Sequence, residues 1–366
     1  MRVLSLSLRE FRSYESALAQ FDDGINVISG RNAQGKTNLL EAVYLLTGGR
    51  SFRTRFDREM IRFNAAQAEV AAEIYSGGRE QRLKITLRRG GKKSMSRNGA
   101  GVRGAELCDS LKAVLFCPDD LNVIKDGAAA RRRLMDMAIC QLRPGYSRLI
   151  SDYNKLYENK MRILRDYCDN PSMLDTLDEF SDGLCRVSAQ LIRYRASFVR
   201  RLAAAAQPVH REFSGADEEL ELCYRTVSSV TDATAPAQEI YESLCGHQRA
   251  HRAAELASAQ CLTGAHRDDI EITINGESAR AFASQGQTRT AALSLKLAER
   301  EIFLQETGEY PVLLLDDVLS ELDSQRQEFV LNRIGGGQTL ITCCEDEQIR
   351  EKTGGRVLFI QDGRVV

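Results

Sequence analysis

The sequence predicts an α/β fold that is interrupted in its middle by a long helical insertion. Near the amino terminus, residues 3–8 alternate between apolar and polar side chains and residues 25–28 are mostly apolar, as in β-strands. From residue 173 to residue 198 the apolar side chains follow a heptad spacing, which is typical of packed helices. Strand patterns return at residues 270–274 and 312–315. The chain is therefore expected to leave a sheet-containing domain, form a helical region and return to the sheet.

The first part of the chain is expected to combine strands with one helix. Leu4, Leu6 and Leu8 share one face of the first strand, and residues 37–46 have the apolar spacing of a helix. Further strands are expected at residues 68–76 and 82–87, followed by a tight hairpin over residues 88–93. Gly90 and Gly91 can adopt the positive φ angles that such a hairpin needs.

The middle of the chain is expected to contain an antiparallel pair of helices. One helix follows Pro144-Gly145, and the heptad helix follows a turn at residues 169–171. A short connection favours antiparallel packing, so the two segments predict a short helical hairpin. An ordinary helical bundle core is the alternative. A strand at residues 220–224 and a helix at residues 237–257 complete the expected insertion over residues 126–261.

Composition and charge exclude several classes of protein. Hydrophobic residues make up 43% and charged residues 28%, which is ordinary for a folded protein and too apolar for disorder. The 50 Lys and Arg residues nearly balance the 51 Asp and Glu residues, so any nucleic-acid surface must be a local patch. No apolar run reaches the roughly 18 residues that a membrane-spanning helix needs. We therefore expect a cytoplasmic protein that does not enter a membrane.

Residues 30–37 match the pattern G-x4-G-K-[ST] between a predicted strand and a predicted helix. In this pattern the glycines let backbone N–H groups surround phosphates, the lysine reaches the β- and γ-phosphates, and the threonine hydroxyl holds Mg²⁺. We expect a nucleotide here, with Lys36 as a catalytic residue and Thr37 as a metal ligand; a chance glycine turn is the alternative. The full set expected to contact the nucleotide is Gly30, Arg31, Asn32, Ala33, Gln34, Gly35, Lys36, Thr37 and Asn38.

Two carboxylates and a second loop are candidates to complete the site. The apolar residues 312–315 lead into Asp316 and Asp317, which predicts a strand buried on both faces with carboxylates at its end. Asp316 is expected to hold Mg²⁺, and Asp317 to polarise an attacking water. A buried strand with a solvated acidic end is the alternative. Ser284-Gln285-Gly286-Gln287 precedes a predicted helix and can form an anion site, although a plain N-cap by Ser284 is the simpler explanation.

Four segments in combination resemble the RecF family of bacterial DNA replication and repair proteins, which have SMC-type ATP-binding-cassette (ABC) heads. The segments are GRNAQGKTNLLEAVY (30–44), CPDDLNVIKDGAAARRRLMD (117–136), TGAHRDD (263–269) and SQGQTRT (284–290). The resemblance extends over the whole chain. It implies an ATPase head built from residues 1–125 and 262–366, with the helical insertion as a second lobe.

The resemblance also implies how such a head would act. ATP bound at the P-loop would be contacted in trans by Ser284, Gly286 and Gln287 of a second subunit, and Asp323 would cross the same interface. The resulting ATP-dependent homodimer would clamp double-stranded DNA at gaps or single-strand/double-strand junctions. Together with RecO and RecR it would help to load RecA and support the SOS response, and slow hydrolysis would release the DNA.

Two features depart from the usual cassette pattern. Asp317 stands where transporter-type cassettes carry a glutamate, and this shorter carboxylate predicts slow hydrolysis. The chain is expected to be a weak, DNA-stimulated ATPase. The usual switch histidine is absent, because the predicted strand at residues 339–342 is followed by Cys343 and Cys344. A Q-loop glutamine cannot be placed either, since Pro118-Asp119-Asp120 stands near its expected position.

Three basic stretches are candidates for contacts with DNA phosphates. Residues 81–105 and 183–211 contain Lys or Arg but no acid, and Arg131-Arg132-Arg133 forms a third cluster. No stacking platform of interleaved aromatic side chains is evident in these stretches, which favours duplex over single-stranded DNA; solvated surfaces are the alternative. His266 and Arg267 are expected near the Ser284 loop, unless His266 is simply a structural residue.

Three other functions fit parts of the sequence. The ATPase subunit of a membrane transporter would carry a much shorter insertion between Gly30 and Ser284 and would have a switch histidine. A chromosome-organising ATPase would have a far longer helical arm than the heptads seen here. A purely structural DNA-bound protein would show no ATP turnover.

Overall fold

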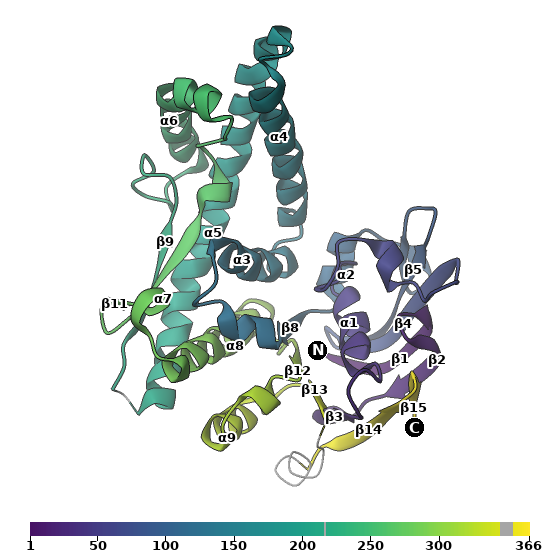
Figure 1. Ribbon diagram of the computed structural model, residues 1–366. Coiled ribbons are helices and arrows are strands. Elements are labelled where there is room, and N and C mark those ends of the chain that lie inside the picture. The colour runs from purple at the N-terminus through teal and green to yellow at the C-terminus, as the bar shows by residue number, and fades with distance from the viewer. Residues whose placement is uncertain (216, 345–353) are drawn as a thin grey trace. The chain divides into compact units, whose positions relative to one another are not determined.

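The computed structural model describes residues 1–215, 217–344 and 354–366, and these form two compact units (Figure 1). The head unit contains Met1–Asn122 and Ala292–Val366, and the lobe unit contains Val123–Ala291. The first predicted boundary, at residue 125, is close to the observed one. The second, at residue 261, differs from the structure because the strand at 269–274 pairs with the strand at 220–225 in the lobe.

A mostly parallel sheet forms the core of the head unit. Its strands follow the order β15-β14-β3-β13-β12-β8, and all adjacent pairs are parallel except β14 with β15. The bounds are β3 Ile25–Ser29, β8 Ala113–Phe116, β12 Val312–Asp316, β13 Thr339–Cys343, β14 Arg356–Gln361 and β15 Arg364–Val365. Every residue of β12 and β13 is buried, as the apolar run at 312–315 predicts.

A second, antiparallel sheet and several short helices complete the head unit. The sheet order is β2-β1-β4-β5-β6-β7, and its alternating apolar residues bury one face. Its strands are β1 Arg2–Phe11, β2 Tyr14–Gln20, β4 Gln67–Ser76, β5 Arg79–Arg88, β6 Ser94–Arg97 and β7 Ala100–Gly101. The helices are α1 Lys36–Leu45, α2 Gly104–Ser110 and α9 Ser324–Arg333. The predicted hairpin over residues 88–93 is confirmed, since it joins the antiparallel strands β5 and β6.

The lobe unit contains the predicted helical hairpin. Helices α4 (Tyr146–Asp166) and α5 (Leu177–Ser214) pack against each other, as Figure 1 shows. The heptad residues Leu184, Leu191 and Phe198 are buried. The helix α5 extends well beyond the heptad and ends at Gly215, whose φ of 73° suits a glycine helix end.

A small sheet and further helices complete the lobe unit. The strands β9 (Leu220–Arg225), β10 (Asp269–Ile274) and β11 (Glu277–Ser278) form a small antiparallel sheet. The helices are α3 Ala128–Leu142, α6 Ala237–Ser258 and α7 Ala279–Phe282. Helix α8 (Gln285–Thr307) begins in the lobe unit and continues into the head unit. None of the described helices combines the length and the apolar character that crossing a bilayer demands.

Candidate nucleotide-binding site

The loop between β3 and α1 has the conformation that its glycines permit. Gly30 and Gly35 have φ angles of 155° and 115°. A Cβ atom on Gly30 would collide with the carbonyl oxygen of Ile360, and one on Gly35 would lie 2.7 Å from Ser13 Oγ. A side chain at either position would therefore strain the backbone and force its neighbours apart. The Tyr14 hydroxyl also donates a hydrogen bond to the Gly35 carbonyl, at 3.0 Å.

Lys36 lies folded over this loop at the start of α1. Its ammonium donates to the carbonyl oxygens of Gly30, at 2.7 Å, and Arg31, at 3.2 Å, and lies 3.4 Å from Cys344 Sγ. The residue is only 7% exposed. Among the described residues, no side chain caps the amino terminus of α1 at Gly35, so its N–H groups and the Lys36 ammonium form a concentrated positive end.

The carboxyl end of β12 meets the start of α1 through direct hydrogen bonds. Thr37 Oγ1 donates to Asp316 Oδ1 at 2.9 Å, and Thr342 Oγ1 from β13 lies 3.0 Å from the same oxygen. Burial raises the pKa of Asp316, the neighbouring Asp317 adds to this effect, and the hydrogen bonds from Thr37 and Thr342 oppose it. The structure thus brings together Thr37 and Asp316, the two oxygen donors that the sequence predicts as metal ligands.

Asp317 adopts a strained backbone conformation beside this pair. Its φ is 55°, a region that non-glycine residues rarely occupy, and its N–H donates to Thr342 Oγ1 at 2.8 Å. Its Oδ1 atom is buried and has no hydrogen-bond partner among the described residues. Strain and an unsatisfied buried oxygen are typical of functional positions.

Sequence reasoning missed a cluster of polar residues next to the loop. Glu41 on α1 is fully buried and accepts two hydrogen bonds from Arg12, at 2.7 and 2.9 Å. Arg53 donates to Asn38 Oδ1 at 2.8 Å and lies 3.4 Å from Glu41, and its charge slightly opposes the rise that burial causes in the pKa of Asp316. The signal available in the sequence was a single acid at position 41 within an otherwise apolar helix face.

The segment that follows β13 also contacts the loop. Cys344 Sγ donates to Asn32 Oδ1 at 2.8 Å, and Thr342 bridges Asp316 and Asp317 as described above. These residues occupy the region where the sequence lacks the usual histidine. On the other side of β12, the parallel neighbour β8 leads into Pro118–Asn122, so Asp119 and Asp120 follow a strand end at the same edge of the sheet.

Ser284 and Gln287 cap helix α8 within the lobe unit. The Gln287 N–H donates to Ser284 Oγ at 3.2 Å, and the Ser284 N–H donates to Gln287 Oε1 at 2.9 Å, so the two residues form a reciprocal capping box. Gln287 Nε2 also donates to Glu218 at 2.8 Å. Ser284 remains exposed, and Gly286 lies in the first turn of α8. The simple N-cap is therefore present, at an exposed helix start.

Asp323 has a comparable local role in the head unit. It is the N-cap of α9, and its side chain accepts a hydrogen bond from the Arg326 N–H at 2.9 Å. This backbone bond is the main cause of the lowered pKa of Asp323. Asp323 is exposed at this helix start, and its predicted contact across a subunit interface stays a prediction.

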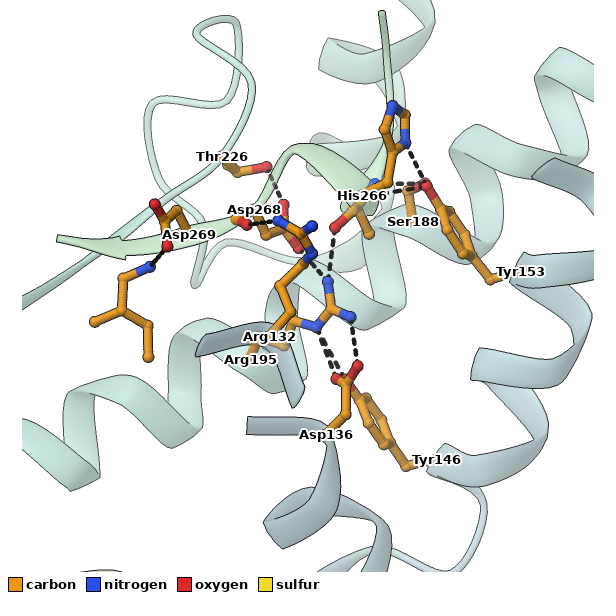
Figure 2. A network of polar contacts seen from close by, with 12 residues as sticks. Arg132, Asp136, Tyr146, Tyr153, Ser188, Arg195, Thr226, His266, Asp268 and Asp269 are labelled. Atoms are coloured by element: carbon orange, nitrogen blue, oxygen red, sulfur yellow. Dashed lines mark hydrogen bonds and ion pairs between the residues drawn. The ribbon is translucent and has the colours of Figure 1, made fainter. Parts of the chain in front are cut away.

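The TGAHRDD segment forms part of a buried network in the lobe unit, which Figure 2 shows. Arg195 lies between Asp136 and Asp268 and donates to both, at 2.8 and 2.7 Å. Arg131 donates to both carboxylate oxygens of Asp269, at 2.6 and 2.9 Å. Arg131 and Arg195 are 3% and 5% exposed, so these two members of the predicted basic stretches cannot contact DNA.

His266 has the structural role that was the alternative in the sequence. Its Nδ1 lies 2.7 Å from the Tyr153 hydroxyl, and its Nε2 lies 2.9 Å from the Cys261 carbonyl oxygen. Burial lowers its pKa to about 4. The ring is therefore neutral near pH 7, with its proton on Nε2 facing the carbonyl.

Comparison with known proteins agrees with this geometry. The family model described as the RecF/RecN/SMC N-terminal domain matches residues 2–363. A protein from Acetivibrio thermocellus named "DNA replication and repair protein RecF" is 36% identical over 99% of this chain and 98% of its own length. The protein of the same name from Desulforamulus reducens is 39% identical over 99% and 97%. The chain belongs to the RecF family.

Solved structures of RecF and SMC head proteins are similar in fold to this RecF-family chain. A recombination mediator protein RecF in complex with ATP, described as part of the RecFOR pathway, has a TM-score of 0.90 at 33% identity, covering 100% of this chain and 96% of that one. An SMC head bound to a domain of ScpA is similar in fold, with a TM-score of 0.58 at 15% identity over 100% and 97%. The predicted SMC-type ABC head with an inserted helical lobe is confirmed.

Proposed function

We propose that the chain is an ATP-binding protein of DNA replication and recombinational repair, and that its nucleotide site is the loop from Gly30 to Asn38. The observation that carries the proposal is the 2.9 Å contact between Thr37 and Asp316 beneath this loop. Lys36 would exchange its bonds to two backbone carbonyls for the β- and γ-phosphates. Membership of the RecF family and the ATP complex of the similar RecF protein support this assignment.

The oxygen donors at the end of β12 fit Mg²⁺. A threonine hydroxyl and a carboxylate are hard ligands of the kind this ion prefers, and the Asp316 carboxylate is already held in place by Thr37 and Thr342. When bound, Mg²⁺ would neutralise charge on the β- and γ-phosphates. Thr37 and Asp316 would hold it, directly or through water.

Asp317 is the residue that we propose to orient the attacking water. Its backbone is fixed by the bond to Thr342, and its buried Oδ1, which no described residue contacts by a hydrogen bond, can accept one from water. An aspartate reaches less far than a glutamate, so hydrolysis is expected to be slow. We also expect bound DNA to stimulate it. Slow hydrolysis suits a protein that uses ATP to hold one conformation and hydrolysis to leave it.

Dimerisation on ATP is the next part of the proposal. Ser284, Gly286 and Gln287 stand at the exposed start of a 23-residue helix, where backbone N–H groups favour an anion. We infer that they contact the γ-phosphate bound by a second subunit, with Asp323 crossing the same interface. Two facing heads would then close only when ATP is bound, and hydrolysis would open them.

The closed dimer would hold double-stranded DNA at gaps and single-strand/double-strand junctions. The RecFOR pathway named for the similar structure supports RecO and RecR as partners, and together with them the dimer would load RecA and support the SOS response. The basic hairpin between β5 and β6 supplies exposed phosphate contacts at Arg88, Arg89 and Lys92. Transporter and chromosome-organising functions are disfavoured, because the insertion is too long for the first and the hairpin too short for the second.

Sedimentation velocity with and without ATP-Mg²⁺ and a gapped duplex tests this function. Wild-type protein is expected to change from monomer to dimer with ATP and to bind the gapped duplex as a dimer. Lys36→Met is expected to bind no ATP and to stay monomeric while keeping its fold by circular dichroism. A Lys36→Met protein that dimerises with ATP would contradict the role given to the loop.

A further inference from the structure

Two exposed phenylalanines of the head unit lie within an arginine-rich segment. The segment RSFRTRFDREMIRF (50–63) alternates arginines with aromatic residues. Phe63 is 87% exposed and Phe56 is 56% exposed, whereas Phe52 is buried. Large aromatic side chains usually gain a great deal by burial, so two exposed ones beside cations need a reason.

Phe63 is held outward by a well-defined turn. The Ala65 N–H donates to the Arg62 carbonyl at 3.1 Å, and Asn64 has a φ of 69°, which is the geometry of a type II turn with Phe63 at its corner. Arg89 fixes the turn from outside, donating to the carbonyls of Ala65, at 3.0 Å, and Arg62, at 3.2 Å. These hydrogen bonds therefore hold the turn in a conformation that leaves Phe63 exposed.

Side chains of the hairpin between β5 and β6 contact the chain next to each of the two phenylalanines. Arg89 contacts the Phe63 turn, while Lys93 donates to Asp57, the residue after Phe56, at 3.0 Å. The guanidinium of Arg58 lies 5.2 Å from the centre of the Phe56 ring. We use the name stacking surface for six exposed residues: Phe56, Arg58, Phe63, Arg88, Arg89 and Lys92.

The acids near the stacking surface are already engaged. Asp57 is paired with Lys93, and Glu10 and Glu15 both lie 3.4 Å from Arg62 nitrogens. The exposed Glu59 carboxylate accepts a hydrogen bond from Thr54 and keeps its charge, which the four cations of the stacking surface outnumber. The exposed side of the hairpin therefore presents aromatic rings and net positive charge.

We propose that the stacking surface binds the single-stranded arm of a DNA junction. Aromatic rings stack on unpaired bases and are tolerant of sequence, while arginines and lysines contact the phosphates between them. Duplex DNA keeps its bases inside the helix and would use only the cations. This inference rests on the proposed DNA-binding function and assigns the unpaired strand to residues 56–63 and 88–92.

Fluorescence anisotropy with ATP-Mg²⁺ and three DNAs tests the inference: a blunt duplex, the same duplex with a single-stranded tail, and that duplex with an abasic tail. Wild-type protein is expected to favour the normal tail over both others by about tenfold. Phe56→Ala/Phe63→Ala is expected to lose this preference and to keep its affinity for the blunt duplex. Leu18→Ala, a 61% exposed apolar residue on β2 of the same sheet, is the matched control and is expected to keep the preference.

A tryptophan reporter gives a second readout, because the sequence contains no tryptophan. The emission of Phe63→Trp is expected to be quenched by the tailed duplex and unchanged by the blunt one. Wild-type protein that binds the normal and abasic tails equally overturns the inference alone, and failure to bind any of the DNAs overturns the proposed function. A double variant that keeps the tail preference but loses RecO or RecR binding assigns the surface to a protein partner instead, which also overturns it.

Discussion

The P-loop of the head unit and the TGAHRDD segment of the lobe unit are both rich in polar residues. They differ in how completely these residues are hydrogen-bonded to other parts of the chain. In the lobe unit, all three nitrogens of Arg195 donate to acceptors of the chain itself, and Asp268 is fully buried. In the head unit, Lys36 donates to carbonyls of its own loop, and Asp317 Oδ1 has no partner among the described residues. Completed bonds stabilise a fold, whereas replaceable or unmade bonds suit a ligand.

The largest expected effect on stability comes from breaking the lobe network. Arg195→Leu leaves Asp268 and Asp136 without their cation, and removing one partner of a buried ion pair costs about 3–5 kcal/mol. Urea unfolding is expected to show this loss, with Arg193→Leu as an exposed control on the same helix. Lys36→Met should change the unfolding free energy little, and equal losses in the two variants would remove the contrast between the regions.

Protonation of His266 is expected to weaken the same region as the pH falls. The folded protein holds the pKa of His266 at about 4, below its ordinary 6.5, so the unfolded chain takes up the proton first. Stability present above pH 6.5 is therefore lost as the pH falls toward 4, by about 2 kcal/mol at pH 5. Urea unfolding at pH 7.5 and pH 5 measures this loss, and His266→Gln should show a correspondingly smaller one.

Thr342→Val is expected to slow ATP hydrolysis about tenfold with little change in ATP affinity, because one orienting hydroxyl is lost beside Asp316 and Asp317. Single-turnover hydrolysis and equilibrium nucleotide binding separate the two effects. Thr339→Val is the matched control, since the buried hydroxyl of Thr339 on the same strand makes no hydrogen bond to the described residues. Equal slowing in both variants would assign the effect to β13 packing instead.

The smallest expected effect on stability is the loss of the Ser284 cap. Ser284→Ala should lower the unfolding free energy by about 1 kcal/mol, because the Gln287 N–H loses its acceptor. Ser284→Asp keeps a capping oxygen and should restore the stability measured in urea. Its negative charge should still prevent ATP-dependent dimerisation, and a dimerising Ser284→Asp protein would argue against a phosphate contact.

The sequence predicts most of the strands, the helical hairpin and the nucleotide loop, because each follows from short-range spacing or a motif. Thr37 and Asp316 could be placed together, since one follows a strand of a parallel sheet and the other ends a strand of the same sheet. Arg131 and Arg195 could not be separated from surface arginines, because their burial depends on acids far away in the chain. Glu41, Arg53 and Thr342 were missed for the same reason: their partners come from other strands and loops.

The measurement that tests the account most directly is sedimentation velocity with ATP-Mg²⁺ on Lys36→Met, Ser284→Arg and their equimolar mixture. Each variant alone lacks half of every composite site and is expected to stay monomeric. In the mixture, the intact loop of the Ser284→Arg chain can face the intact Ser284 of the Lys36→Met chain, so a heterodimer with one bound ATP is expected. Dimerisation of Ser284→Arg alone to the wild-type extent would contradict the proposal that ATP joins two subunits through Ser284.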